Sequence, residues 1–130
     1  MNKVILVTAS ILGLLTIVLG AFASHGLRGS ISVESLQAFE TGVRYQMYHS
    51  IVLLFIGITG VFSMKTKRVL YYLILIGILL FSGSIYGLAT NELSSFDFKS
   101  IGFVTPIGGL LLIISWGVML VNFLKLKADK

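Results

Sequence analysis

Four long apolar runs dominate the chain, and short polar stretches separate them. The runs extend over residues 4–24, 45–64, 69–90 and 101–124. Each has about the 20 residues that a helix needs to cross a hydrocarbon core roughly 30 Å thick. Apolar and polar positions do not alternate along the runs, as they would in a transmembrane β-strand. Because backbone amides in a bilayer must be satisfied within the segment, we predict an all-α membrane protein. Its fold would be a four-transmembrane-helix bundle that forms one domain over residues 1–130.

The first run has a second interpretation. Lys3, the apolar stretch and the triplet Ala21-Phe22-Ala23 resemble a secretory signal peptide with its cleavage site. The run is, however, longer than the roughly 7–15 apolar residues of such a peptide. We therefore expect it to stay in the protein as the first span.

The segment between the first two runs is long and has a helical pattern of its own. Ser32 is a suitable N-cap, and Glu34 in the first turn favours the helix dipole. Apolar residues then recur at helical spacing, at Val33, Leu36, Phe39 and Val43. We predict a short amphipathic helix on the outer surface, with its apolar stripe on lipid or on the bundle. Gly42 would let it bend into the second span.

Composition supports a membrane protein and excludes several kinds of chemistry. Apolar residues make up 56% of the chain and charged residues 12%, and the second value is well below the roughly 25% of soluble proteins. The chain has no cysteine, which excludes disulfides, thiolate metal sites and a cysteine nucleophile. No catalytic or phosphate-binding motif is present. We expect no enzymatic activity, no metal and no cofactor.

The distribution of basic residues predicts the orientation. Both termini and the turn at residues 64–68 fall on the same side of a four-span bundle. That side carries seven basic residues and the other side three, namely Arg28, Arg44 and Lys99. The seven are Lys3, Lys65, Lys67, Arg68, Lys125, Lys127 and Lys130. The positive-inside rule then places both termini in the cytoplasm of a multi-pass protein of the cell membrane. Because these charges flank apolar runs, they point to lipid headgroups and not to nucleic acid.

The polar residues within the spans gather toward the predicted outer ends. The stretch TGVRYQMYHS at residues 41–50 stands at the start of the second run, and the other three runs contribute polar groups at the same predicted level. The inner halves offer much less, with Ser115 and Trp116 among their few polar groups. Polar residues inside spans usually face the bundle or a cavity. The candidate ligand-binding residues of this outer polar layer are His25, Arg44, Tyr45, Gln46, His49, Ser84, Tyr86 and Thr105.

Three of these residues have alternative explanations. His49 would fasten helices through hydrogen bonds, handle a ligand, proton or metal, or lie exposed at the interface. His25 would simply end the first helix, with Gly26 as a left-handed residue after it. Arg44 would pair with Glu40 one helical turn away, bind a headgroup phosphate, or hold an anionic ligand. The two histidines could in principle ligate one haem or metal, a weak signal.

Glycines inside the runs predict close contacts between helices. Gly83 and Gly87 form a G-x-x-x-G pattern, and Gly20 forms a looser small-residue pair with Ser24. Small residues let helix backbones approach closely in lipid. The residues expected in helix packing are Gly20, Gly83, Gly87, Gly108 and Gly109, either within the bundle or between copies of the chain.

Two functions fit these features. The first is a helical interaction or assembly module that packs against membrane lipid and forms a homo-oligomer or part of a larger membrane complex. The second is a small-molecule or ion binding or transport protein, with a polar site at the outer end of the bundle around His49 and Arg44. The sequence leaves the ligand, if any, and the partner undefined.

Four motifs carry a resemblance to a known family. They are GAFASHGL at 20–27, FETGVRYQMYHS at 39–50, GSIYGLA at 83–89 and VTPIGGLLLIISWG at 104–117. Together and in this order they resemble the family called domain of unknown function 423, small bacterial membrane proteins similar to eukaryotic transmembrane protein 256. The family pattern near the first motif is closer to GAFGAHGL, so Ala23-Ser24 is a small-for-small departure. The resemblance implies a four-span membrane protein and no particular activity.

Overall fold

The computed structural model describes residues 1–95 and 97–127, so Lys130 lies outside the described residues. This part of the chain is helical, and its only β-type pairing is an isolated bridge between Arg28 and Ile31. The long helices are α1 (Asn2–Phe22), α2 (Val33–Ile58), α3 (Met64–Ala89) and α4 (Val104–Leu124). Three short segments complete the fold: a π-helical turn η1 (Ala23–Leu27) and the 3₁₀ helices η2 (Asn91–Leu93) and η3 (Phe98–Ile101).

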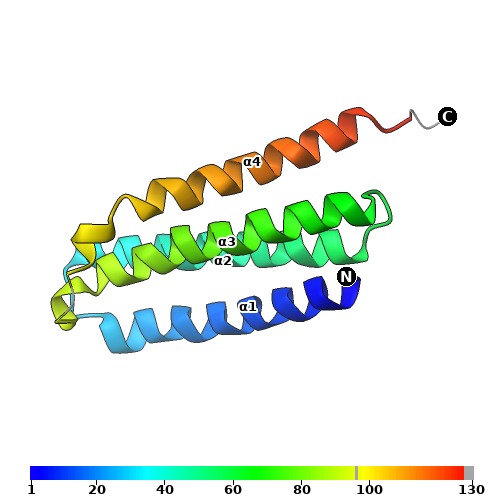
Figure 1. The fold of residues 1–130 in the computed structure, drawn as a ribbon. Helices are drawn as coiled ribbons and strands as arrows, with labels where there is room; N and C mark the ends of the chain where they lie inside the picture. The colour runs from blue at the N-terminus through cyan, green and yellow to red at the C-terminus, as the bar shows by residue number, and fades with distance from the viewer. Residues whose placement is uncertain (96, 128–130) are drawn as a thin grey trace.

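The four long helices pack in chain order (Figure 1). α1 packs on α2, α2 on α3 and α3 on α4, whereas direct contacts between α1 and α3 and between α2 and α4 are few. Both termini and the turn between α2 and α3 lie at one end of the bundle, which we call the terminal end. The segments that join α1 to α2 and α3 to α4 lie at the other end, which we call the loop end.

Three stretches of the described chain are long and apolar enough to cross a membrane: Asn2–Leu27, Met64–Ala89 and Phe98–Leu124. α2 is as long as α3, at 26 residues, but it is not among them. Its first three turns carry Glu34, Glu40 and Arg44, and its middle carries Gln46 and His49. The sequence therefore predicted an apolar span where the structure has a helix of mixed character.

The expected short outer helix is not a separate element. Its residues form the first turns of α2, which continues without a break through Gly42 to Ile58. Ser32 caps this helix as predicted, since its Oγ accepts a hydrogen bond from the amide of Ser35 at 3.1 Å. The apolar stripe packs on the bundle through Phe39, which is buried, while Val33 at its start is exposed.

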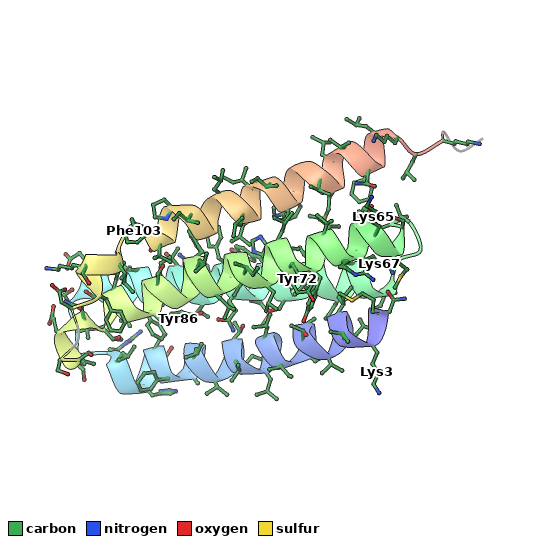
Figure 2. All side chains as sticks on the ribbon, in the orientation of Figure 1. Lys3, Lys65, Lys67, Tyr72, Tyr86 and Phe103 are labelled. Carbon is green, nitrogen blue, oxygen red and sulfur yellow. The ribbon has the colours of Figure 1, made fainter. Side chains whose placement is uncertain are left out.

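The turn between α2 and α3 lies earlier than the basic residues suggested. It occupies residues 59–63, and Ser63 caps α3 by accepting from the amide of Thr66 at 3.2 Å. Lys65, Lys67 and Arg68 therefore belong to the first turns of α3 and not to the turn itself. Figure 2 shows Lys3, Lys65 and Lys67 together at the terminal end.

The end of the first helix also differs from the expectation. Gly26 lies in η1 and not in a left-handed position, which is taken instead by Gly29 with a φ of +86°. The π-helical turn directs the buried residues Ala23 and Leu27 into a small cluster at the loop end. The main apolar core fills the rest of the bundle and contains residues of all four helices.

Gly108 is the point of closest approach between α3 and α4. A Cβ atom placed on it would lie 2.3 Å from the backbone nitrogen of Phe81, so the two backbones touch there. Gly42 has a related role between α2 and α3, because a Cβ there would lie 2.7 Å from the ring of Tyr86. The expected bend at Gly42 is replaced by close packing, since this residue is buried within a continuous helix.

We predict that Gly108→Ala destabilises the bundle. The added methyl group cannot move away from a backbone atom without separating the helices, and such overpacking costs about 1–3 kcal/mol. Thermal unfolding in detergent measures the loss. Gly117→Ala on the same helix is the matched control, since no atom lies within 4 Å of its added Cβ. Equal stability of the two variants would contradict the tight contact.

Candidate functional site

Gln46 joins three helices through its side-chain amide. The Nε2 group donates to the carbonyl oxygen of Leu12 in α1 at 2.9 Å, and Oε1 accepts from the hydroxyl of Tyr86 in α3 at 2.7 Å. The same Leu12 carbonyl accepts from the hydroxyl of the buried Thr16 at 2.6 Å. Because a carbonyl can only accept, the amide nitrogen must face α1. Gln46 is itself buried, so these bonds replace water that it cannot reach.

A second bond between α2 and α3 lies beside this network. The buried Ser82 donates from Oγ to the carbonyl oxygen of Gly42 at 2.8 Å. The absence of a side chain on Gly42 lets the Tyr86 ring lie against α2, and this brings the Tyr86 hydroxyl to Gln46. Gly42, Gln46, Ser82 and Tyr86 therefore act together as a polar fastening of α2 to α3.

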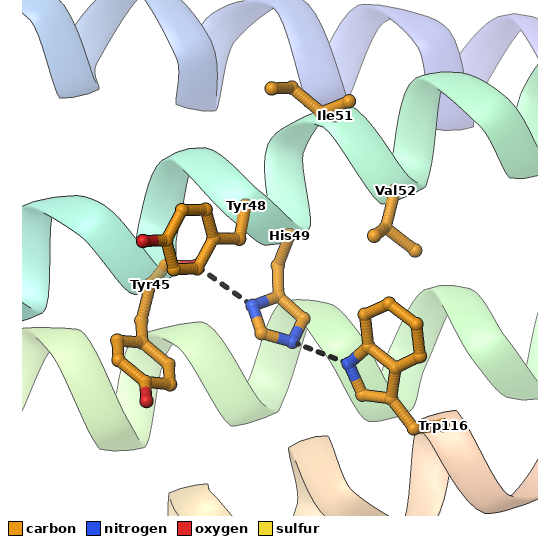
Figure 3. A pocket seen from close by; sticks show the side chains of 6 residues that line it. All are labelled: Tyr45, Tyr48, His49, Ile51, Val52 and Trp116. Atoms are coloured by element: carbon orange, nitrogen blue, oxygen red, sulfur yellow. Dashed lines mark hydrogen bonds between the residues drawn. The ribbon is translucent and has the colours of Figure 1, made fainter.

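His49 links α2 to α4 (Figure 3). Its Nε2 atom accepts from the indole Nε1–H of Trp116 at 3.1 Å. An indole nitrogen can only donate, so Nε2 carries no proton, and Nδ1–H donates to the Tyr45 carbonyl oxygen at 2.8 Å. His49 is buried, and both ring nitrogens are occupied by partners within the chain. This arrangement fits the interpretation of His49 as a residue that fastens helices.

A third polar contact joins α3 to α4 nearer the loop end. The hydroxyls of Ser84 and Thr105 are hydrogen-bonded to each other, and Ser84 also donates to the carbonyl oxygen of Phe81 at 3.0 Å. Thr105 is the second residue of α4, so the pair fixes the start of that helix on α3.

The predicted polar layer is therefore three separate contacts and not one site. Gln46 and Tyr86 meet between α1, α2 and α3, His49 meets Trp116, and Ser84 meets Thr105. Gln46 and His49 are three residues apart on α2, but Gln46 bonds to α1 and α3 whereas His49 bonds to α4. Sequence spacing placed these residues at one level but could not assign them to interfaces.

Three of the predicted site side chains stay outside these contacts. The ring of Tyr45 lies near His49 and Phe81, but its hydroxyl has no hydrogen-bond partner among the described residues. His25 is exposed in η1, and it is not a partner of either nitrogen of His49. Arg44 is exposed on α2, and its guanidinium donates to the hydroxyl of Thr41 at 3.0 Å. Of the three alternatives for Arg44, the pair with Glu40 does not form among the described residues, where the guanidinium bonds to Thr41.

The glycines expected in helix packing differ in what they contact. Gly20 makes ordinary contact with Val43 across α1 and α2, and Gly109 with the ring of Phe81. Gly87 lies under the ring of Phe98 in η3 and not against a long helix. A Cβ added to Gly83 would meet no atom within 4 Å, so open space lies beside this glycine in its own chain.

Sequence reasoning missed two bonds at the terminal end. The ammonium group of the buried Lys67 donates to Oδ1 of Asn2 at 2.9 Å, and the hydroxyls of Thr8 and Tyr71 bond at 2.8 Å. Both join α1 to α3.

Trp116 was missed as a site residue as well, because it was assigned to the inner half of the last run. Its indole N–H is a donor in a largely apolar helix. Trp116 is half exposed, but its indole N–H lies among apolar residues, so this donor was a signal that a polar partner on another helix was needed.

Two cavities flank the His49–Trp116 bond. One holds about 430 Å³ and is lined by Tyr45, Tyr48, His49, Ile51, Val52 and Trp116. The other holds about 300 Å³ and adds residues of α3 and α4. A further cavity of about 380 Å³ lies between α1 and α3, with Gln46, Gly83 and Tyr86 in its lining. All three have mainly apolar walls, so each suits an apolar chain or helix better than an ion.

The described residues contain no cluster of three or more metal-binding side chains. Within the same part of the chain, every buried side-chain nitrogen or oxygen has a hydrogen-bond partner. Gln46, His49, Lys67, Ser82 and Ser84 make bonds that connect helices, whereas Thr16, Ser50 and Ser115 bond to carbonyl oxygens of their own helices. The architecture defines a small, all-helical membrane protein whose exposed surface is largely apolar.

The chain belongs to the family described as Protein of unknown function (DUF423), whose model matches residues 19–109. The match includes the first three motifs on which the resemblance was based and the beginning of the fourth. The expectation from the sequence is thus confirmed.

Curated relatives are described as UPF0382 membrane proteins, and the chain aligns with them over nearly their whole length. The chain is 38% identical to the UPF0382 membrane protein YwdK of Bacillus subtilis, covering 95% of this chain and 98% of that protein. It is 38% identical to a UPF0382 membrane protein of Haemophilus influenzae, with 89% and 90% covered. It is 31% identical to the UPF0382 inner membrane protein YgdD of Escherichia coli, with 97% and 93% covered. No solved structure matches the chain significantly.

We predict that Gln46 and Tyr86 are energetically coupled. Gln46→Leu leaves the Tyr86 hydroxyl without its acceptor, and Tyr86→Phe removes the donor. Coupling between polar side chains on membrane helices averages about 0.6 kcal/mol and reaches about 1.7 kcal/mol. A double-mutant cycle measured by unfolding in mixed micelles should give a value in this range.

The matched control for this cycle is Tyr72→Phe combined with Gln46→Leu. Tyr72 is on the same helix, is half exposed and has no hydrogen bond within the described residues. Its coupling to Gln46 should be close to zero. A coupling as large as that of Tyr86 would mean that Gln46→Leu disturbs α3 generally.

Proposed function

We propose that this protein is a four-span protein of the cytoplasmic membrane that acts as a helical interaction module. The observation that carries the proposal is the complete pairing of buried polar side chains in the described part of the chain. Because the buried polar side chains are paired within the protein, the apolar outer faces are the surface that contacts lipid and partner helices. This role needs no enzymatic activity and no cofactor.

The proposal requires α2 to cross the membrane, although the hydropathy of this helix does not favour a crossing. Two structural features support it. α2 has 26 residues, about 39 Å at roughly 1.5 Å per residue, and it lies beside the apolar α1 and α3 along its length. Its central polar residues Gln46, His49 and Ser50 are buried and hydrogen-bonded. A helix whose polar groups are satisfied by neighbours can cross a bilayer inside a bundle.

Charge supports an orientation with both termini in the cytoplasm. The terminal end carries Lys3, Lys65, Lys67 and Arg68, together with the basic residues after α4. The loop end carries only Arg28, Arg44 and Lys99 in the described part of the chain. The positive-inside rule then places the terminal end in the cytoplasm. The name of the Escherichia coli relative, an inner membrane protein, agrees with a location in the cytoplasmic membrane.

We predict that labelling of single cysteines reports four crossings. The chain has no cysteine, so each introduced one is read without background. A membrane-impermeant maleimide added to intact cells should label Ser30→Cys and Ser95→Cys at the loop end but not Gly60→Cys in the turn between α2 and α3. All three should react after the membrane is permeabilised. Labelling of Gly60→Cys in intact cells would exclude the crossing by α2 in this orientation.

The groove between α1 and α3 is the surface that best suits a partner helix. Its walls are Leu15 and Val18 of α1 and Leu79 of α3, and Gly83 lies in it with open space above the backbone. A glycine with no neighbour in its own chain lets a second helix approach closely. We propose that a transmembrane helix of a second copy, or of another protein in a larger membrane complex, packs here.

We predict that Gly83→Leu removes this assembly without unfolding the bundle. A Cβ added to Gly83 meets no atom of its own chain within 4 Å, so we expect the leucine side chain to extend into the groove and block a second helix. Chemical cross-linking in native membranes should show a larger species with the wild-type protein and its loss with Gly83→Leu. The matched control is Gly117→Leu, which also adds a side chain in open space, but on α4. A larger species unchanged in Gly83→Leu, or absent from the wild type, would contradict the proposed surface.

The other function that the sequence suggested, a polar small-molecule or ion site around His49 and Arg44, has less support. Both nitrogens of His49 are occupied, and Arg44 is exposed on α2 outside the cavities beside that residue. The two residues therefore do not converge on one polar space.

A further inference from the structure

The crevice between α2 and α4 is open on a face of the bundle that the proposed assembly does not use. α2 and α4 make few direct contacts, and the His49–Trp116 bond bridges the space between them. The two cavities on either side of this bond share Tyr45, His49 and Trp116. Their remaining walls are Tyr48, Ile51 and Val52 on one side and apolar residues of α3 and α4 on the other. The crevice is mainly apolar, and aromatic side chains form part of its walls.

The end of the crevice nearer the loop end has polar groups that nothing in the described chain satisfies. Tyr45 and Tyr48 are about half exposed, and in the described residues neither hydroxyl has a hydrogen-bond partner. In Figure 3 both hydroxyls point away from His49, and that of Tyr48 points toward the N-terminal side of α2. This end of the crevice therefore offers two hydrogen-bond donors to a ligand that lies along it.

Arg44 extends this polar end. It precedes Tyr48 by four residues, so the two side chains lie on the same face of α2, one turn apart. Arg44 is exposed, makes no ion pair within the described part of the chain, and uses one N–H on Thr41. A guanidinium has five N–H donors in a planar fork that fits a phosphate. A cation, a phenol and an apolar crevice thus follow one another along a single face.

We propose that this face binds an anionic phospholipid. The phosphate lies between Arg44 and the Tyr48 hydroxyl, and one acyl chain occupies the crevice over Ile51 and Val52, against Trp116. The positive charge selects a lipid with net negative charge over a zwitterionic one, while the apolar walls hold the chain of either. The site is independent of the groove at Gly83, so it holds whether or not a partner helix packs there.

Trp116 provides a direct readout, because it is the only tryptophan of the chain and it lines both cavities. The protein is reconstituted in phosphatidylcholine vesicles that contain a small fraction of lipid with brominated acyl chains. The brominated lipid is phosphatidylglycerol in one series and phosphatidylcholine in the other. Bromine quenches indole fluorescence on contact, so the ratio of quenching gives the relative affinity of the crevice for the anionic lipid.

We predict that the wild-type protein favours brominated phosphatidylglycerol by about fivefold in relative affinity. This is the ratio that about 1 kcal/mol for one basic residue near an anionic headgroup gives at 25 °C. Arg44→Gln should reduce the ratio to about one without changing the quenching by phosphatidylcholine. Tyr48→Phe, which keeps the ring and removes the hydroxyl, should reduce it in part.

The matched control is Arg28→Gln. It removes one positive charge from the same end of the bundle, but Arg28 lies after η1 and outside the crevice. The ratio should therefore stay at the wild-type value in this variant. Equal quenching by the two brominated lipids in the wild type would overturn the proposal. So would an equal loss of preference in Arg28→Gln and Arg44→Gln, or the absence of quenching by either lipid.

Discussion

The structure depends on one constraint, which is that a buried polar side chain in a helix bundle needs a hydrogen-bond partner within the protein. α2 carries three buried polar side chains, Gln46, His49 and Ser50, and it lies between α1 and α3. Gln46 satisfies this constraint toward α1 and α3, and His49 satisfies it toward α4. The bonds are directional, so they fix the rotation of α2 about its axis. Apolar packing alone would leave that rotation less defined, because lipid tails are as apolar as the helix faces.

Small residues make these bonds geometrically accessible. Gly42 lets the Tyr86 ring lie on α2, and Gly108 lets the backbones of α3 and α4 touch near Phe81. The Ser84–Thr105 bond then falls within reach at the start of α4. Close approach and hydrogen bonding therefore support each other, and a larger residue at either glycine would also remove a polar contact nearby.

Most of the fold could be predicted from the sequence, and less of the site. Long apolar runs and the Ser32 cap defined helices because these signals are local. The continuous α2 was not predicted, because the sequence pattern of its first turns indicated a separate surface helix. In the structure these turns belong to one helix, and Phe39 packs them on the bundle. The partner of His49 is 67 positions away in the chain, at Trp116, and no spacing rule connects them. Arg44 and His25 each belong to a motif that also contains buried residues, but both are exposed, because membership of a motif does not determine burial.

The packing of each helix mainly on its neighbour in the chain has a consequence for biogenesis. α1 and α2 can associate as soon as both have left the ribosome, α3 then adds to an existing surface, and α4 completes the bundle last. Among the hydrogen bonds between helices in the described chain, those of His49 with Trp116 and of Ser84 with Thr105 wait for α4, which is synthesised last. A nascent chain halted before α4 therefore lacks the partners that these two side chains have in the complete bundle.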